Sequence, residues 1–196
     1  MQVDYLDYLP DDFTSSAIQL YFNALQEKFA PILSSDGRAL QALASNIETG
    51  KCLVAIYDEK LVGIMGIQTS KGGFVNPSLK VMVRIYGILG GILRMGGLAI
   101  LHHITTTDEL YVGGVAVAHE MRGKGIGLGL FELLERIALK KGIRTISLEV
   151  IDTNPRAKTL YEHLGFVVMK TKTIWPLNLF VKFPFRLTSL MVKTIG

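Results

Sequence analysis

The sequence contains few of the residues that build small secreted domains or zinc modules. One cysteine, Cys52, is present among 196 residues, which excludes a disulfide scaffold and a cysteine-rich zinc site. Charged residues are also scarce, at 19% against 49% hydrophobic residues, and this excludes a disordered chain. The length fits a single domain over residues 1–196 with one buried core. Since a single cysteine favours a reducing compartment, we expect a cytoplasmic protein.

Acidic residues are missing from two long segments. Residues 60–107 contain five basic residues and no acidic one, and residues 163–196 repeat this pattern. Because the net charge of the whole chain is only +4, the remainder is acidic. A basic surface of this kind often contacts phosphates or a membrane. Nucleic acid is not expected as a partner, because the basic residues alternate with aliphatic side chains more than with stacking aromatic ones.

The N-terminus lacks the cationic region and apolar run of a secretory signal peptide, and four aspartates lie within the first twelve residues. The most apolar stretch, residues 85–101, is shorter than the roughly 20 residues of a spanning helix. Arg94 and several glycines also interrupt it. We therefore expect a soluble chain with an unusually apolar, basic segment rather than a spanning helix.

Helical periodicity is clear near the start of the chain. Apolar residues with helical spacing predict a helix that is capped by Asp11 and Asp12 and ends near Phe29. Pro31 is expected to stop this helix, and a second helix is expected over residues 37–47.

Two apolar runs follow, over residues 52–57 and 61–67, and the polar turn between them predicts a strand hairpin. For residues 70–107 no structure is predicted. Each interior glycine destabilises a helix by about 1 kcal/mol relative to alanine, and the segment contains several of them.

The second half of the chain alternates strand and helix patterns. The pair Gly113 and Gly114, within the first of these strands, invites a β-bulge. Gly142 and Gly165 are placed to end the two helices. This alternation predicts an α/β layer structure. The expected elements are strands at 110–117, 145–150 and from 166, with helices after residue 127 and from residue 155.

A glycine-rich loop, Arg122-Gly-Lys-Gly-Ile-Gly127, joins the first of these strands to the following helix. Free backbone N–H groups and the dipole at a helix N-terminus favour an anion there, and glycines let a phosphate approach the backbone closely. The two cations in the loop add charge, so we interpret it as a phosphate site rather than a plain turn. The spacing fits neither a dinucleotide-binding G-x-G-x-x-G loop nor a Walker loop.

Two blocks of the sequence resemble the GNAT N-acetyltransferase superfamily. The first runs from Val115 to Gly127, and the second is Asn154-Pro-Arg-Ala-Lys-Thr-Leu-Tyr-Glu-His-Leu-Gly-Phe166. The glycine loop matches its R/Q-x-x-G-x-G/A acetyl-CoA loop, and the second block is similar to the helix whose tyrosine faces the thioester sulfur. The resemblance implies an α/β (α+β) GNAT fold, with a central mixed, mostly antiparallel sheet, a splayed strand pair and flanking helices. Residues 1–196 would form one such domain, and the segment at about 70–107 is an insertion that departs from the family pattern.

The resemblance also implies acetyl-CoA as co-substrate. Its pyrophosphate would lie at the glycine loop, and its pantetheine arm would pair along an open strand edge. Asn154 matches a residue that contacts the pantetheine or helps to open the strands, and an N-cap role is an equal alternative. No metal is expected. The residues expected to bind the co-substrate are Val115, Ala116, Val117, Arg122, Gly123, Lys124, Gly125, Ile126, Gly127 and Asn154.

Two residues are candidates for catalysis. Tyr161 matches the family's general acid, which would protonate the leaving thiolate, and its alternative role is that of a core aromatic on a helix face. Glu109 matches the position at which some relatives carry a general-base glutamate, and its alternative is a solvated carboxylate at the strand end. Glu149 is a second candidate base. His102 and His103 make a poor metal pair, because adjacent side chains point apart in a strand.

The implied activity is transfer of an acetyl group from acetyl-CoA to a primary amine of a small molecule or peptide by direct attack. The alternative is a non-catalytic CoA-binding sensor, or an interaction module that uses the basic, apolar insertion. For the insertion and the aromatic C-terminal stretch, three roles stay open. These are a homodimer contact, an apolar acceptor pocket, and peripheral membrane contact through residues 80–104 and 174–187.

Overall fold

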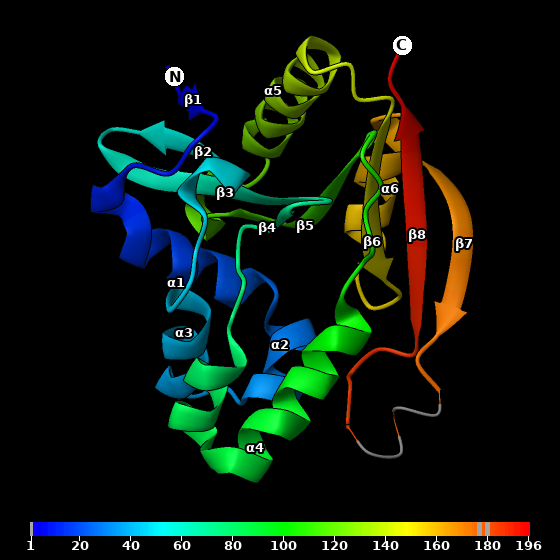
Figure 1. The fold of residues 1–196 in the computed structure, drawn as a ribbon. Coiled ribbons are helices and arrows are strands. Elements are labelled where there is room, and N and C mark those ends of the chain that lie inside the picture. Colours follow the sequence, from blue (N-terminus) through cyan, green and yellow to red (C-terminus); the bar gives the residue numbers. More distant parts are fainter. Residues whose placement is uncertain (1, 176–177, 179–180) are drawn as a thin grey trace.

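One mixed sheet runs through the computed structural model, which describes residues 2–175, 178 and 181–196 (Figure 1). Its strands are β1 (Asp4–Leu6), β2 (Cys52–Tyr57), β3 (Lys60–Thr69), β4 (Gly72–Gly73), β5 (Glu109–Val117), β6 (Thr145–Ile151), β7 (Val167–Thr173) and β8 (Leu187–Thr194). Within the described residues their order is β1-β2-β3-β5-β6-β8-β7, and β4 pairs with β3. Every pair is antiparallel except β5 with β6.

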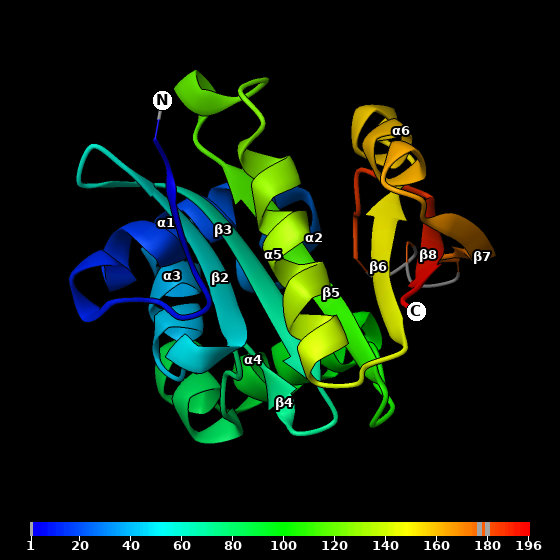
Figure 2. The ribbon, with the colours of Figure 1, turned by 90° about the horizontal axis from the view of Figure 1, so that it is seen from above.

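Helices cover both faces of this sheet. The α-helices are α1 (Thr14–Ala24), α2 (Gln26–Leu33), α3 (Gly37–Ala44), α4 (Leu79–Leu101), α5 (Ile126–Lys140) and α6 (Pro155–His163), and the 3-10 turns are η1 (Asp11–Phe13), η2 (Thr49–Lys51) and η3 (His119–Met121). Figure 2 shows α5 over one face, with α1 and α3 behind the other. The predicted fold class, a mixed and mostly antiparallel sheet flanked by helices, is therefore confirmed.

Each face of the sheet has its own core. Leu130 and Phe131 of α5 are buried together with side chains of β2, β3, β5 and β6. On the other face, Ile18 and Phe22 of α1 are buried with side chains of α2, α3, β2, β3 and β5. The central strands are thus held between two packed layers, and this fixes the position of β5.

The predicted hairpin and β-bulge are both present. β2 and β3 are joined at Asp58 and Glu59, whose φ angles of 51° and 57° are those of a two-residue hairpin turn. Between β3 and β5, Gly66 pairs with Gly114 while the next residue pairs with Val112. Gly113 is therefore the extra residue of a bulge, which bends β5 in its middle.

The single helix predicted for residues 11–29 is instead a 3-10 turn followed by two helices. Asp11 and Asp12 lie in η1, and neither caps α1. Leu25, with φ −107° and ψ 18°, separates α1 from α2. Its side chain packs against the bulged strand, because a Cβ added to Gly114 would lie 2.4 Å from Leu25 Cδ1. The sequence gives no signal of this break, since the apolar spacing continues through it.

Pro31 does not stop the helix, contrary to the prediction. It lies inside α2, which continues to Leu33. A proline removes one helical hydrogen bond, but the two residues after it, Ile32 and Leu33, are buried and hold the last turn in place. The second predicted helix is confirmed as α3, in which Asp36 accepts a hydrogen bond from the Arg38 N–H and so caps the N-terminus.

Three strands were not predicted, namely β1, the short β4 inside the insertion, and β8. β1 is only three residues long and pairs with the edge of β2. β8 lies between β6 and β7, so it separates strands that are adjacent in the chain. Its buried residues, Thr188 and Met191, are three positions apart. A strict alternation of polar and apolar residues, which is the usual sign of a strand, is therefore missing from β8.

The insertion at residues 70–107 folds as β4 followed by α4, and α4 consists of two helical limbs, 79–86 and 88–101. The limbs meet at Gly87, whose φ of 75° and ψ of 171° are not helical. Gly91 then lies against the first limb, because a Cβ there would be 2.7 Å from Val83 N. Glycine therefore serves two different purposes in this helix, a sharp turn and a close approach of two backbones.

Gly91→Ala is expected to lower the free energy of unfolding by about 2 kcal/mol, because the added methyl group meets backbone atoms that cannot turn aside. Urea unfolding followed by circular dichroism measures the effect. Gly96→Ala is the matched control. It lies in the same limb with nothing within 4 Å, so higher helix propensity should stabilise it by about 0.5–1 kcal/mol. Equal effects of the two substitutions would contradict the close packing of the limbs.

Candidate active site

The glycine loop of residues 122–127 leads from β5 into α5 and opens toward solvent. Gly123 and Gly125 have φ angles of 77° and 82°, and nothing lies within 4 Å of a Cβ at either position. Gly125 is the N-cap of α5 and has no side chain with which to cap it. The N–H groups of the first turn are therefore available to an anionic ligand.

Two cations of this loop lie beside the end of β5. The Arg122 Nε donates a hydrogen bond to the Val117 carbonyl at 3.2 Å, which ties the guanidinium to the strand edge. The Lys124 Nζ lies 3.7 Å from the Met121 Sδ. Because both side chains are exposed, they can reach a phosphate group bound at the loop.

β5 and β6 separate beyond the bulge, as Figure 2 shows. Their parallel pairing runs from Glu109 with Thr145 to Val112 with Leu148 and goes no further. A cavity of about 340 Å³ lies where they diverge, and α2 and α6 close its sides. Because residues 114–117 pair with β3 on one side and not with β6 on the other, one edge of β5 is open to a ligand that binds as a strand does.

Tyr161 projects from α6 and lines this first cavity. Its ring also packs against Phe131 and Phe166, at centroid distances of 5.7 Å and 6.1 Å. Burial raises the pKa of Tyr161 to about 12, so its hydroxyl keeps its proton at neutral pH. The roles of general acid and of core aromatic are thus compatible for Tyr161, since its ring packs on two core aromatic residues and the residue still borders the cavity.

The other residues predicted to bind the co-substrate contribute in different ways. The side chains of Ala116 and Ile126 are buried in the core, so only their backbone groups face a ligand. The Asn154 Oδ1 accepts a hydrogen bond from the Ala157 N–H at 3.1 Å, which confirms the N-cap role, and Asn154 also borders the first cavity. Contact of these residues with a ligand stays a prediction.

A second cavity of about 410 Å³ lies next to the first, between α1, α2, the bulge and α4. Its walls are mainly apolar and include Tyr21, Phe29, Phe74, Met95 and Leu98. Gly113 and Lys28 border both cavities. The bulge is therefore the place at which molecules bound in the two cavities would meet.

Lys28 was missed in the sequence. It lies on α2, and in the single helix expected from the sequence it would fall two turns after Tyr21. Its Nζ donates a hydrogen bond to the Glu149 carbonyl oxygen at 3.5 Å. Burial lowers the pKa of Lys28, although nearby Glu149 acts in the opposite direction. A cation on an otherwise apolar helical stripe was the signal that could have identified it.

Glu109 begins β5 and lies in a small polar cluster. Its carboxylate is 2.9 Å from the His103 Nε2, accepts a hydrogen bond from the Thr106 N–H at 3.2 Å and also contacts the Ser147 hydroxyl. The His103 ring in turn stacks on Tyr111, at 4.3 Å between centroids, and Tyr111 borders the second cavity. Glu109 is thus a partly buried, hydrogen-bonded carboxylate rather than a solvated one.

The two histidines and the second candidate base have separate surroundings. His102 borders the second cavity, whereas His103 pairs with Glu109. Among the described residues, no group of three or more metal-ligating side chains is found. Glu149 borders the first cavity and lies 3.6 Å from the Lys172 Nζ.

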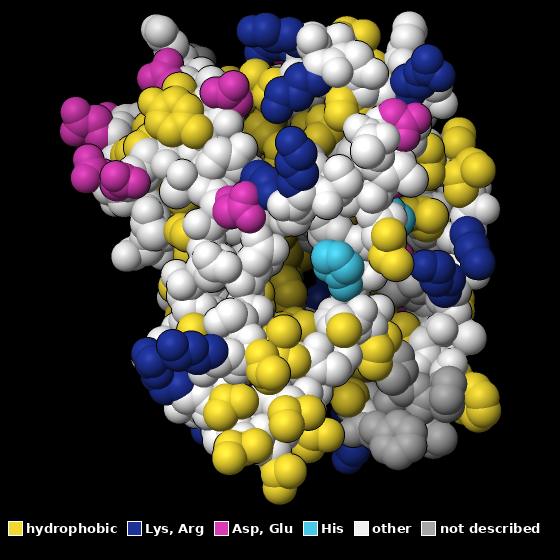
Figure 3. All heavy atoms as spheres, viewed as in Figure 1, with side chains coloured by type: hydrophobic (Ala, Val, Ile, Leu, Met, Phe, Trp, Pro, Cys, Tyr) yellow, Lys and Arg dark blue, Asp and Glu magenta, His cyan; other side chains and the backbone are white. Residues whose placement is uncertain are grey.

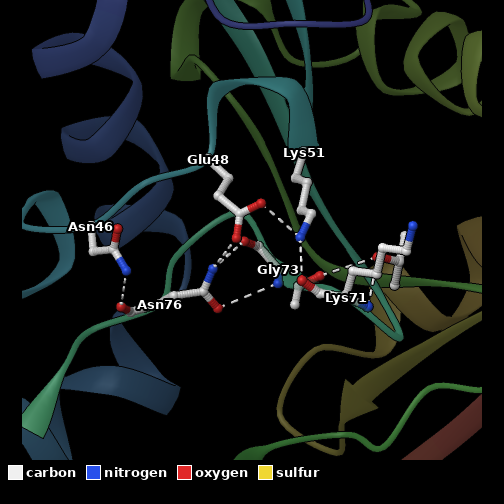
Figure 4. A network of polar contacts seen from close by, with 8 residues as sticks. Asn46, Glu48, Lys51, Lys71, Gly73 and Asn76 are labelled. Carbon is white, nitrogen blue, oxygen red and sulfur yellow. Dashed lines mark hydrogen bonds and ion pairs between the residues drawn. The ribbon is translucent and has the colours of Figure 1, made fainter.

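A polar network holds one end of the second cavity in place (Figure 4). Asn76, which borders the cavity, donates hydrogen bonds to the Glu48 carboxylate at 2.8 Å and to the Gly73 carbonyl at 2.7 Å. Its own carbonyl accepts from Asn46 at 2.9 Å, and Lys51 pairs with Glu48 at 2.7 Å. The network fixes the chain between β4 and α4 to the loop before β2, and so positions the first limb of α4.

Sequence comparisons identify one family. Residues 17–166 match the model of the acetyltransferase (GNAT) family. A thialysine N-epsilon-acetyltransferase from Bos taurus is 39% identical over 57 residues, which are 29% of this chain and 34% of the relative. The enzyme of the same name from Sus scrofa is 37% identical over 60 residues, or 31% of this chain and 35% of the relative. The chain thus spans about a third of the length of these curated relatives.

Solved structures share the fold at low sequence identity. A ribosomal-protein-S18-alanine N-acetyltransferase from Escherichia coli is 16% identical with a TM-score of 0.61, over 100% of this chain and 95% of that one. An agmatine N-acetyltransferase is 14% identical with a TM-score of 0.63, over 99% and 100% of the two chains. At these identities the likeness concerns the fold alone.

Proposed function

Because the chain belongs to the acetyltransferase (GNAT) family, we propose that it transfers an acetyl group from acetyl-CoA to a primary amine of a small molecule or peptide. The observation that supports this best is the pair of cavities that meet at the bulge of β5. One follows the open strand edge beside Tyr161, and the other is a separate, mainly apolar space for the acceptor. The similarity to thialysine N-epsilon-acetyltransferases supports an amine as acceptor.

The first cavity and the glycine loop would bind the donor. Backbone N–H groups of residues 126–128, with Arg122 and Lys124, would hold the pyrophosphate. The open edge of residues 113–117 would pair with the amide groups of the pantetheine arm. This arrangement directs the thioester toward Gly113, where the two cavities meet.

The reaction at this point is direct attack of the amine on the thioester carbonyl. A backbone N–H near the bulge would stabilise the negative charge that develops on the carbonyl oxygen. The bond between carbon and sulfur then breaks, and Tyr161 would give its proton to the leaving thiolate. The hydroxyl carries the proton before the step, since burial raises its pKa to about 12.

Glu109 is the proposed general base, acting on the amine through the polar cluster that it forms with His103. Removing the carboxylate in Glu109→Gln is expected to lower kcat by about 100-fold. Steady-state assays at saturating acetyl-CoA measure the effect. Should Glu149→Gln cause this loss instead, while Glu109→Gln keeps the original kcat, the base is Glu149.

The walls of the second cavity favour an amine with an apolar body. Aromatic and aliphatic side chains dominate the lining, and among its described residues no aspartate or glutamate is present. Lys28 adds a cation beside the bulge. A polycationic acceptor would therefore find no carboxylate to pair with in this cavity and would be repelled by Lys28, whereas an uncharged alkyl or aryl body would be buried favourably.

An acceptor screen with acetyl-CoA, in which free thiol is measured, tests the proposal. We expect faster CoA release with octylamine and phenethylamine than with spermidine or an aminoglycoside. Faster release with the polycations would overturn the apolar acceptor. If no amine, amino acid or peptide N-terminus were acetylated while CoA still bound, the acetyl transfer would be refuted and a CoA-binding sensor would remain.

A further inference from the structure

The outward face of α4 is the most apolar exposed surface of the insertion. Leu89 and Leu93 are 77% and 74% exposed, and Ile88, Ile92 and Ile100 are also exposed. On the second limb these positions follow helical spacing, so they form one continuous stripe. Figure 3 shows the hydrophobic side chains gathered at the α4 end of the molecule.

The other face of the same limb is fully used by the fold. Gly91 packs against the first limb, and Gly97 packs against Ile32 of α2. Met95 and Leu98 line the second cavity. The outward stripe is therefore not needed to hold α4 on the protein, and its exposure is unusual for so many large aliphatic side chains.

Basic residues accompany this stripe. Lys80 and Arg84, one helical turn apart on the first limb, are both exposed. No acidic residue occurs between residues 60 and 107, and the acidic side chains visible in Figure 3 lie mainly toward the other end of the molecule. Apolar side chains flanked by cations are the pattern by which helices bind the surface of anionic bilayers.

We propose that the outward face of α4 docks on the surface of an anionic lipid bilayer. This goes beyond acetyl transfer and does not depend on it. A second copy of the chain fits the surface less well, because a two-fold contact uses the same patch on both copies, and residues 60–107 contain no acidic residue that could pair with Lys80 and Arg84. Of the C-terminal segment expected to join such a contact, residues 176, 177, 179 and 180 lie outside the described residues, so only α4 is assigned.

In this structure α4 lies on the protein surface and does not have the shape of a spanning helix. Within the described residues, Leu79–Ile100 is the one helix long and apolar enough to cross a bilayer by length and composition. The turn at Gly87 divides it, however. The longer limb, residues 88–101, would extend only about 21 Å at 1.5 Å per residue, which is short of a hydrocarbon core of about 30 Å.

Cosedimentation with vesicles of phosphatidylcholine, with and without about 30% phosphatidylserine, tests the docking. The protein should pellet with the anionic vesicles at low salt and dissociate as the salt concentration rises. Leu89→Ser with Leu93→Ser should lower the bound-to-free ratio by about 10-fold or more, because both side chains would bury in the interface. Lys80→Glu with Arg84→Glu should reduce it to a similar extent.

Leu139→Ser is the matched control, because Leu139 is 60% exposed but lies on α5. Its vesicle binding should equal that of the unchanged protein. The docking would be overturned if the unchanged protein stayed in the supernatant with anionic vesicles at low salt, or if the double serine variant bound as well as the unchanged protein. A third result would also overturn the docking. If sedimentation-velocity ultracentrifugation showed a dimer that Leu89→Ser with Leu93→Ser dissociates, a second copy of the chain would cover the stripe.

Discussion

Tyr161→Phe is expected to lower kcat by about 100-fold and to leave the affinity for acetyl-CoA unchanged. The phenyl ring keeps the contacts with Phe131 and Phe166, so the variant removes only the hydroxyl that would protonate the leaving thiolate. Single-turnover CoA release measures the chemical step, and fluorescence or calorimetric titration with CoA measures binding.

Tyr5→Phe is the control for loss of a tyrosine hydroxyl. Tyr5 packs on Gly129 of α5 and borders neither of the two cavities, so its variant should keep the original kcat. If Tyr161→Phe retained kcat within about threefold, the residue would be a core aromatic and the proton would come from elsewhere.

The pH dependence of Tyr161 follows from the direction of its shift. Its pKa is raised to about 12 in the folded protein, above the value near 10 of an unfolded tyrosine. The folded state therefore favours the neutral phenol, and this stabilisation is present below pH 10 and lost as the pH rises through 12. No alkaline limb due to Tyr161 should accordingly appear in the activity below about pH 11.

The second large effect is expected at the glycine loop. Replacing both cations, Arg122→Ala with Lys124→Ala, should raise the KM for acetyl-CoA by at least about 100-fold, since hydrogen bonds to charged groups contribute about 1.5–3 kcal/mol each. Both side chains are exposed, so the variant should fold. A donor without phosphates, the acetyl thioester of N-acetylcysteamine, should react with the same KM in the variant and in the unchanged protein.

The control variant removes two charges from the opposite end of the same helix. Lys140 and Lys141 lie at the C-terminus of α5 and are exposed, so Lys140→Ala with Lys141→Ala should leave the KM for acetyl-CoA unchanged. An equal rise of KM for both donors in the loop variant would contradict a phosphate contact, because it would indicate a distorted loop.

Glycine was the most reliable guide from sequence to structure. The bulge at Gly113 and the loop from residue 122 were both predicted, because a glycine pair inside a strand invites a bulge and because glycine readily adopts the positive φ seen at Gly123 and Gly125. The helix ends at Gly142 and Gly165 were also predicted, and both residues have positive φ. These features depend on local geometry, which a short stretch of sequence can specify.

Features that depend on distant contacts could not be predicted. The two limbs of α4 are set by the packing of Gly91 on residues eight and nine positions earlier, and Pro31 is tolerated because the residues after it are buried. Lys28 borders both cavities only because α2 crosses the bulge of β5. The spacing of apolar residues indicates the type of one helix or strand at a time. It therefore does not predict contacts between elements that are distant in the sequence.

The meeting of the two cavities at Gly113 has a consequence for the order of chemical events. The donor and the acceptor would come into contact at Gly113, which has no side chain to separate them. Both would therefore be bound in a ternary complex before any covalent bond forms or breaks. The only thiol of the chain, Cys52, is buried in β2, and burial raises its pKa to about 12. No acetylated cysteine would then form on the protein. The acetyl group would pass directly from acetyl-CoA to the amine in a single displacement.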